Sequence, residues 1–116
     1  MKRRTVRDLV ADPSHAGLLE GAALLGEAAG GERLLVLVGL WLDERGRVAR
    51  ARYRATSCAS LIAYAEAACV LAEQGQRADA LGPDRVRAAV AGVHPVHRDR
   101  ADLVALAFAR ARAGPI

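Results

Sequence analysis

The spacing of hydrophobic residues changes along the chain and predicts both strands and helices. The densest run extends from Leu34 to Leu42 and is apolar on both faces, so Glu32 to Leu42 is expected to be a central strand. The polar stretch from Asp43 to Gly46 is typical of a turn. Hydrophobic and polar residues then alternate from Arg47 to Ala55, which predicts a second strand antiparallel to the first.

The returning strand is expected to have two different faces, because successive side chains of a strand point in opposite directions. The residues of the first face are mostly small, which allows a helix to approach closely: Ala49, Ala51, Tyr53 and Ala55. The second face carries a basic row: Val48, Arg50, Arg52 and Arg54. This basic row fits a solvent-exposed sheet face, and it also fits a docking surface for an acidic partner.

The stretch from Leu61 to Glu73 predicts a helix that is apolar nearly all round, and Gly75 is suited to end it. A helix of this kind is buried in the core. Tyr64 and Glu66 are expected to mark its less buried side. Cys69 lies on the same helix and is interpreted as a small buried hydrophobic residue.

Further helices are predicted near both ends of the chain. Thr5 to Ala11 fits a short helix with Thr5 as its N-cap. Pro83 to Ala91 fits another, and Arg77 to Leu81 fits a single helical turn. The last helix is expected from Asp99 to Ala113. Its inner face is predicted to consist of four residues: Leu103, Leu106, Ala107 and Arg110.

The segment before the long strand is ambiguous. Ala16 to Ala29 has a helical composition interrupted by glycines, so it fits either a frayed helix or a loop followed by a strand near Ala22 to Ala28. Asp12 to His15 has turn chemistry, and His15 is expected to be a surface loop residue. The order of helix, strands and helices predicts an α+β fold, with a small antiparallel sheet and helices packed on one face.

Composition narrows the class of protein. The 116 residues suit a single domain spanning 1–116, and 53% of them are hydrophobic, although only 3% are aromatic. The low aromatic content argues against nucleic-acid binding through base stacking. The longest apolar run has nine residues, about half of what a membrane-spanning helix requires. Two cysteines are too few for a disulfide scaffold, and we expect a cytoplasmic protein.

Among the residues of the chain, Cys58 is the strongest candidate for a chemically reactive side chain. It follows the returning strand and precedes the apolar helix. A thiol at a helix N-terminus lies near the positive end of the helix dipole and near unpaired backbone N–H groups, which favour the thiolate. The thiolate is the form that binds metals and accepts sulfur. Residue chemistry alone leaves open whether Cys58 is functional.

The sequence around Cys58 resembles a known family. The stretch Arg54-Ala55-Thr56-Ser57-Cys58-Ala59-Ser60-Leu61-Ile62-Ala63 is similar to the Gly-Cys-Gly-Ser-Ala-Ile-Ala stretch of the U-type iron–sulfur cluster scaffolds, IscU, SufU and the N-terminal domain of NifU. Weaker similarity extends from about Asp12 to Arg112 and includes several short matches: Asp12-Pro13, Gly26-Glu27, Gly31, Glu32, Leu103, Ala107 and Phe108. The resemblance implies a SufE/NifU-like α+β fold with a three-stranded antiparallel sheet, and it favours a strand over Ala22 to Ala28.

The chain departs from the family at most of the ligand positions. The family uses three cysteines and an aspartate, whereas this chain has Gly30 and Arg100 at two cysteine positions and Glu32 at the aspartate position. Only Cys58 is kept, which is poor for an iron–sulfur cluster. The resemblance leaves a mixed ligand set that could hold zinc or a [2Fe–2S] cluster: Glu32, Cys58, Asp99 and His97. The charge of Arg100 instead disfavours a cation and favours the Cys58 thiolate, so the absence of any cofactor is the other expectation.

The resemblance implies an iron–sulfur cluster assembly scaffold-like protein, degenerate in its ligands and not an enzyme. Cys58 would then accept a persulfide or bind one metal ion, and the partner would be a cysteine desulfurase or another assembly protein. A working scaffold, with a cluster shared by two copies, is a second hypothesis. The alternative is a small basic module that binds an acidic protein or RNA through Arg50, Arg52 and Arg54.

Overall fold

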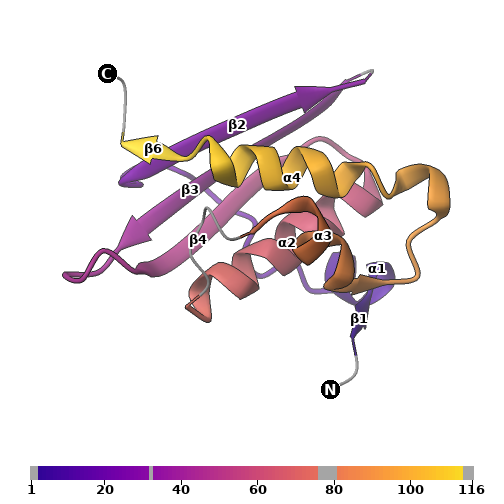
Figure 1. Ribbon diagram of the computed structural model, residues 1–116, viewed down its shortest axis with the longest axis horizontal. Helices are drawn as coiled ribbons and strands as arrows, with labels where there is room; N and C mark the ends of the chain where they lie inside the picture. The colour runs from indigo at the N-terminus through magenta and orange to yellow at the C-terminus, as the bar shows by residue number, and fades with distance from the viewer. Residues whose placement is uncertain (1–2, 32, 76–80, 114–116) are drawn as a thin grey trace.

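The computed structural model describes residues 3–31, 33–75 and 81–113. Three long antiparallel strands form its sheet: β2 (Leu24–Gly30), β3 (Leu34–Leu42) and β4 (Val48–Ala55). β3 lies between the other two, as its apolar sequence predicted, and the two-residue strand β6 (Arg112–Ala113) extends the sheet beside β2. The predicted α+β fold with a three-stranded antiparallel sheet is therefore confirmed (Figure 1).

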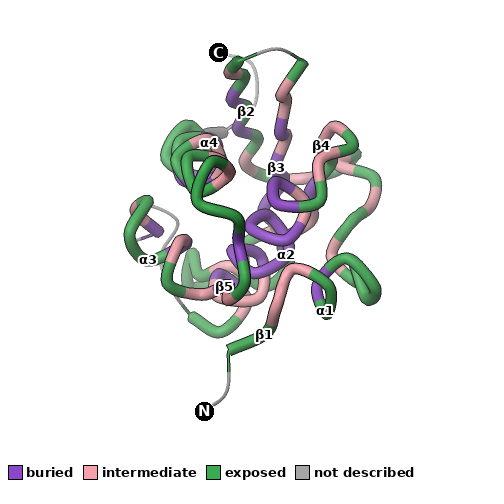
Figure 2. The backbone as a smooth tube through the Cα atoms, turned by 90° about the vertical axis from the view of Figure 1, so that its right-hand side faces the viewer, coloured by how far each residue is buried: buried purple, intermediate pink, exposed green. Residues whose placement is uncertain are grey.

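The main helices cover one face of this sheet (Figure 1). α2 (Ala59–Glu73) packs on β4, and α4 (Arg100–Ala109) packs on β2. α1 (Val6–Ala11) packs against α2, and α3 (Pro83–Ala88) packs against α4. The core consists mainly of the inward side chains of the strands, of α4 and of α2, which lies near the centre of the molecule (Figure 2).

Close approach between α4 and the sheet depends on Gly26 of β2. A Cβ atom placed there would lie 2.0 Å from the carbonyl oxygen of Ala107 and 2.7 Å from the backbone nitrogen of Ala111. Both are backbone atoms, so neither can move aside without shifting the helix terminus. Glycine at this position therefore sets the distance between β2 and α4.

Several element boundaries differ from those predicted. The predicted strand Ala22 to Ala28 is present but is displaced toward Gly30. The predicted helix Pro83 to Ala91 ends at Ala88, because the next residues form β5 (Val90–Ala91) and pair in parallel with β1 (Arg4–Thr5). Pairing with a distant strand is a tertiary contact that local helix propensity does not encode. The predicted turn from Arg77 to Leu81 lies mostly outside the described residues.

The last helix is shorter than predicted and buries a different face. It begins at Arg100 and ends at Ala109, after which the chain extends to form β6 beside β2. Leu106 and Arg110 are exposed, so their assignment to the inner face was wrong, whereas Ala107 is buried. The buried residues are Ala101, Val104, Ala105, Ala107 and Phe108. Phe108 is buried in the core, Leu103 is partly buried against it, and Leu106 is 38% exposed.

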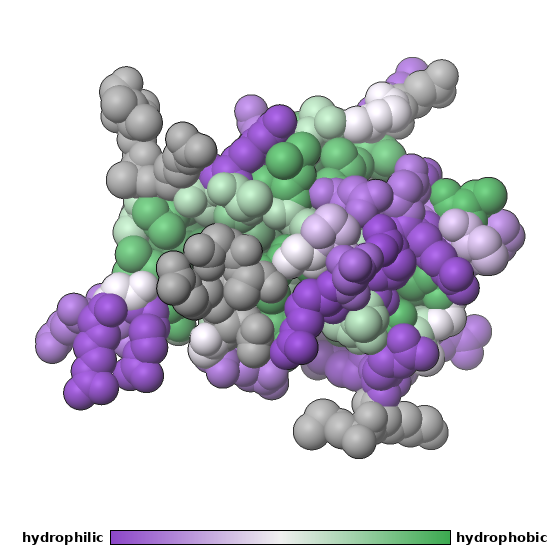
Figure 3. All heavy atoms as spheres, in the orientation of Figure 1, coloured by the Kyte–Doolittle hydropathy of each residue, from purple (hydrophilic) through white to green (hydrophobic). Residues whose placement is uncertain are grey.

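The surface over the helices is strongly polar in one region. In Figure 3, hydrophilic side chains form a diagonal band across the face seen in Figure 1. An ion pair links α3 and α4, because the Arg87 guanidinium of α3 contacts Asp102 of α4 at 2.7 Å, and Arg87 also contacts Asp84 within α3 at 2.8 Å. Within the described residues, no helix is both long enough and apolar enough to cross a membrane.

Candidate functional site around Cys58

Cys58 lies where the sequence placed it, between β4 and α2. It is the N-cap residue of α2, with an extended backbone (φ −131°, ψ 115°). Its carbonyl oxygen accepts the first helical hydrogen bond from the amide of Ile62 at 2.9 Å, but its side chain makes no capping hydrogen bond. The thiol is half-buried, so it is held in place by packing and still accessible from solvent.

The Arg100 guanidinium lies beside the Cys58 thiol. Arg100 is the first residue of α4, so packing of α4 against α2 brings it to the N-terminus of α2. A hydrogen bond to Asp99, together with the neighbouring Cys58, raises the pKa of Arg100. The site therefore pairs one thiol with one permanent positive charge.

Asp99 is already engaged by the same arginine. Its carboxylate accepts a hydrogen bond from Nη1 of Arg100 at 2.7 Å, and this bond holds the pKa of Asp99 below its ordinary value. His97 lies nearby, with its Nδ1 atom 3.2 Å from the hydroxyl oxygen of Ser60 in the first turn of α2. Cys58, His97 and Asp99 are thus gathered at the adjacent N-terminal ends of α2 and α4.

The proximity of Cys58, His97 and Asp99 is not sufficient for a metal-binding site. Among the described residues, no group of three or more histidine, cysteine, aspartate or glutamate side chains could hold a metal ion. Glu32, the remaining residue of the predicted ligand set, lies outside the described residues. The mixed ligand set of Glu32, Cys58, His97 and Asp99 therefore stays a prediction.

The position of the first family cysteine is filled by a different side chain. A Cβ atom on Gly30 would lie 2.8 Å from Cδ2 of Leu103, so Leu103 of α4 occupies the space that a side chain at Gly30 would need. Next to it is a pocket of about 540 Å³ that is also lined by Asp99 and Arg100. Glycine, leucine and arginine therefore line the side of the site formed by β2 and α4, where the resemblance expects two of the cysteines.

The second cysteine of the chain does not belong to this site. Cys69 is fully buried on α2, as predicted, and burial raises the pKa of its thiol well above the ordinary value. A protonated, enclosed thiol is inert toward metals and sulfur donors. Cys58 is therefore the accessible thiol among the described residues.

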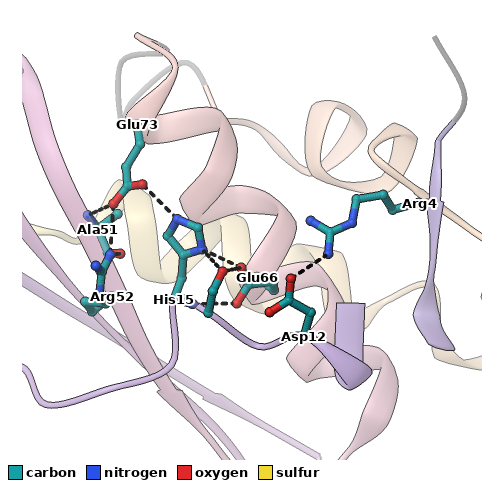
Figure 4. Close-up of polar contacts among 8 residues, drawn as sticks. Arg4, Asp12, His15, Ala51, Arg52, Glu66 and Glu73 are labelled. Carbon is teal, nitrogen blue, oxygen red and sulfur yellow. Dashed lines mark hydrogen bonds and ion pairs between the residues drawn. The ribbon is translucent and has the colours of Figure 1, made fainter. Parts of the chain in front are cut away.

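The sequence interpretation missed a partly buried polar network between His15, Glu66 and Glu73 (Figure 4). His15 Nδ1 contacts Oε2 of Glu66, and its backbone amide donates to Oε1 of the same carboxylate at 2.9 Å. On its other side, His15 Nε2 lies 2.7 Å from Oε1 of Glu73. Glu73 also accepts hydrogen bonds from the amide of Ala51 at 2.8 Å and from Arg52 at 2.9 Å.

One prediction about these residues was wrong: Tyr64 and Glu66 do not mark a less buried side of α2, because they are 1% and 0% exposed. His15 does lie in a loop, as predicted, but its side chain is only 15% exposed and contacts Glu66. A buried carboxylate requires hydrogen-bond donors, and the 12–16 loop supplies them. The signal in the sequence was that Glu66 is the lone charged residue between Leu61 and Ala72.

The basic row on β4 is not a uniform free surface. Arg52 turns toward α2 and forms an ion pair with Glu73 at 2.9 Å. The guanidinium of Arg50 lies over the ring of Trp41, 4.9 Å from its centroid. Two of the three arginines thus have partners within the molecule, and the geometry lends no support to a nucleic-acid or acidic-protein surface along Arg50, Arg52 and Arg54.

Comparison with known proteins identifies one match that covers nearly the whole chain. The family model described as NifU-like N terminal domain matches residues 1–113. No curated protein matches the chain. The matched range includes Cys58, Arg100 and every element of the sheet.

Proposed function

Because the chain belongs to the family of NifU-like N-terminal domains, which are iron–sulfur cluster assembly scaffolds, we propose that it handles sulfur through Cys58 instead of holding a complete cluster. The observation that carries this proposal is the half-buried thiol at the start of α2 with the Arg100 guanidinium beside it. A fixed positive charge stabilises a thiolate or a persulfide anion and disfavours a metal cation.

The proposed step is transfer of one sulfur atom from a protein persulfide. The Cys58 thiolate attacks the terminal sulfur of the donor's Cys–S–SH group. The donor's S–S bond breaks as a new S–S bond forms on Cys58, and the donor cysteine leaves as a thiolate. Oxidation state is conserved overall, so the transfer needs no external oxidant or reductant.

The donor in this proposal is a cysteine desulfurase. Proteins of this family work with other iron–sulfur assembly proteins. A thiol that is half-buried at a helix terminus can be reached by a flexible donor segment, whereas the enclosed Cys69 cannot. Cys58 is therefore proposed as the acceptor for this class of partner.

The residues around Cys58 fit a sulfur acceptor better than a cluster ligand set. Scaffolds of this family bind iron–sulfur clusters as their cargo, and such clusters are typically held by cysteine thiolates. Here Leu103 fills the space at Gly30, and Arg100 presents a cation at another ligand position. We propose that the chain acts by binding and accepting sulfur, in keeping with a family that is generally non-catalytic.

The experiment that tests this proposal is a persulfide assay. The protein is incubated with a cysteine desulfurase and free cysteine, and its persulfides are trapped by alkylation and located by mass spectrometry. We expect one added sulfur atom on Cys58. Cys58→Ser should abolish the label, whereas Cys69→Ala should keep it.

Two outcomes would contradict the proposal. One is a wild-type chain that remains unlabelled while a known acceptor is labelled in the same reaction. The other is labelling that persists in Cys58→Ser.

A further inference from the structure

A second pocket lies away from Cys58, between α3, β5 and the segment that leads into α4. It has a volume of about 450 Å³, which is within the range of small-molecule sites. Three guanidinium groups and one carboxylate line it: Arg3, Arg87, Arg98 and Asp84. Positive charge therefore exceeds negative charge in its lining.

The three arginines differ in how far they are already engaged. Arg87 is held by Asp84 and Asp102, and Arg3 donates to the carbonyl oxygen of Ala88 at 3.3 Å. The Arg98 guanidinium makes no hydrogen bond or ion pair within the described part of the chain. Arg98 thus offers a planar set of donors to a ligand.

Tyr64 supplies an independent observation at the same pocket. Its side chain rises from α2, is only 1% exposed and contributes to the pocket lining. Across residues 3–31, 33–75 and 81–113 its hydroxyl group has no hydrogen-bond partner. The hydroxyl is not one of the buried polar atoms that lack a partner in the described residues, so it reaches the surface of the pocket and can donate to a ligand there.

The charges around Tyr64 indicate which kind of ligand group its hydroxyl would bind. Burial raises the pKa of its hydroxyl, so the group remains a neutral donor, while Arg87 and Arg98 act in the opposite direction. The charges of Asp99 and Asp102 raise the pKa of the same hydroxyl, but both carboxylates are bound by arginines. A neutral O–H donor next to a free guanidinium is suited to an oxyanion.

We propose that this pocket binds a small organic oxyanion, with a phosphate or carboxylate group held by Arg98 and Tyr64. The remaining wall is apolar and includes Val90 and Val93. The pocket is larger than a bare inorganic ion, so the ligand carries an organic portion beside its charged group. This site is independent of Cys58 and of the sulfur transfer proposed above.

The test uses phenyl phosphate and benzoate as probes, with benzyl alcohol as the uncharged control. Binding to the full chain is followed by backbone amide NMR shifts near Val93 and Arg98. We expect at least one anion to bind and the alcohol not to bind. Binding of phenyl phosphate alone assigns a phosphate ligand, and binding of benzoate alone assigns a carboxylate.

Matched variants show whether the named residues form the site. Arg98→Ala should weaken binding by roughly tenfold or more, because it removes hydrogen bonds from a charged donor. Tyr64→Phe removes one hydroxyl and should weaken binding several-fold, about the effect of one hydrogen bond. Arg85→Ala removes the same charge from an exposed residue of α3 outside the pocket and should leave binding unchanged.

The proposal is overturned if neither anion binds. It is also overturned if Arg85→Ala weakens binding as much as Arg98→Ala does, since that result would indicate general attraction to positive charge. Unchanged binding by Cys58→Ser is expected, which separates this site from the sulfur-transfer site.

Discussion

Arg100 is the residue that most clearly sets the chemistry of the Cys58 site. It lies where the family pattern places a cysteine, and its guanidinium bridges Asp99 and the neighbourhood of the thiol. Its Nε atom is buried and has no hydrogen-bond partner in the described part of the chain. The Arg100 guanidinium therefore provides a fixed positive charge next to a thiolate or persulfide anion on Cys58.

The first prediction concerns the reactivity of Cys58. Arg100→Ala should slow alkylation of Cys58 by iodoacetamide by about threefold to tenfold at neutral pH, because a cation that attracts the thiolate is removed. Arg100→Lys keeps the charge and should react at a rate closer to wild type. Buried Cys69 should stay unlabelled in the folded protein and serves as the internal reference. Equal rates in the wild type and in Arg100→Ala would contradict the role given to Arg100.

The second prediction concerns Glu73 and acid stability. Burial opposes its ionisation, but the amide of Ala51, His15 and Arg52 outweigh burial and lower its pKa from the ordinary value of 4.5. A lowered folded-state pKa adds stability that is present above the ordinary value and is lost as pH falls through the folded-state value. Glu73→Gln should therefore reduce the free energy of unfolding at pH 7, and the difference from wild type should shrink at acid pH.

Urea denaturation at neutral and acid pH measures this difference. Glu44→Gln is the matched control, because Glu44 is exposed in the turn between β3 and β4. A difference between Glu73→Gln and wild type that stays constant with pH would show that Glu73 does not contribute through its charge.

At the scale of elements, the contact between β2 and α4 depends on backbone proximity. Two glycines face α4 but meet different atoms: Gly26 meets the backbone of the helix, and Gly30 meets the flexible end of Leu103. A backbone obstacle cannot rotate away, whereas a leucine side chain can.

The third prediction follows from that difference. Gly26→Ala should lower the free energy of unfolding by about 3 kcal/mol, and Gly30→Ala by about 1 kcal/mol, because overpacking costs more when the obstacle is rigid. Gly17→Ala is the control, since its added methyl would meet only Arg52 Cδ at an ordinary 3.8 Å. Chemical denaturation of the three variants measures the order, and a Gly30 variant less stable than the Gly26 variant would contradict it.

At the scale of the whole molecule, packing brings together the end of β2 and the starts of α2 and α4. Gly30 and Arg100 line one pocket, and Arg100 lies beside Cys58. These are the three positions at which the family resemblance expects cysteines. The structure thus brings close together the segments on which the resemblance expects three cysteines, and this chain has Gly30, Cys58 and Arg100 at those positions.

The fourth prediction uses this arrangement. Anaerobic reconstitution of the wild type with iron and sulfide should leave little stable visible absorption, because one thiol next to a guanidinium is a poor cluster site. The variant Gly30→Cys/Arg100→Cys/Leu103→Ala supplies two thiols and the space for one of them. It should gain visible absorption and bound iron, and both should fall when Cys58→Ala is added. Strong cluster binding by the wild type would contradict the prediction and favour a scaffold with substitute ligands.

The elements that the sequence predicted well are those set by local hydrogen bonding and by burial of one continuous segment. The hairpin of β3 and β4, the all-round apolar α2 and the place of Cys58 between strand and helix follow from hydrophobic spacing alone. Thr5 also caps α1 as predicted, because its hydroxyl accepts a hydrogen bond from Asp8 three residues away. In each case the interacting groups are close in sequence, or the pattern repeats with the period of the element.

The tertiary structure decided which distant polar groups meet. His15 forms a hydrogen bond with the buried Glu66 carboxylate, 51 residues away in sequence. The third helix ends before β5, because β5 pairs with β1. Leu103 fills the space at Gly30, and Arg98 and Tyr64 share one pocket. A carboxylate or a hydroxyl needs a partner wherever it is buried, but the sequence does not say from which part of the chain that partner comes. The sequence by itself therefore determined the fold class and singled out Cys58, whereas long-range packing determined the charge and the space around it.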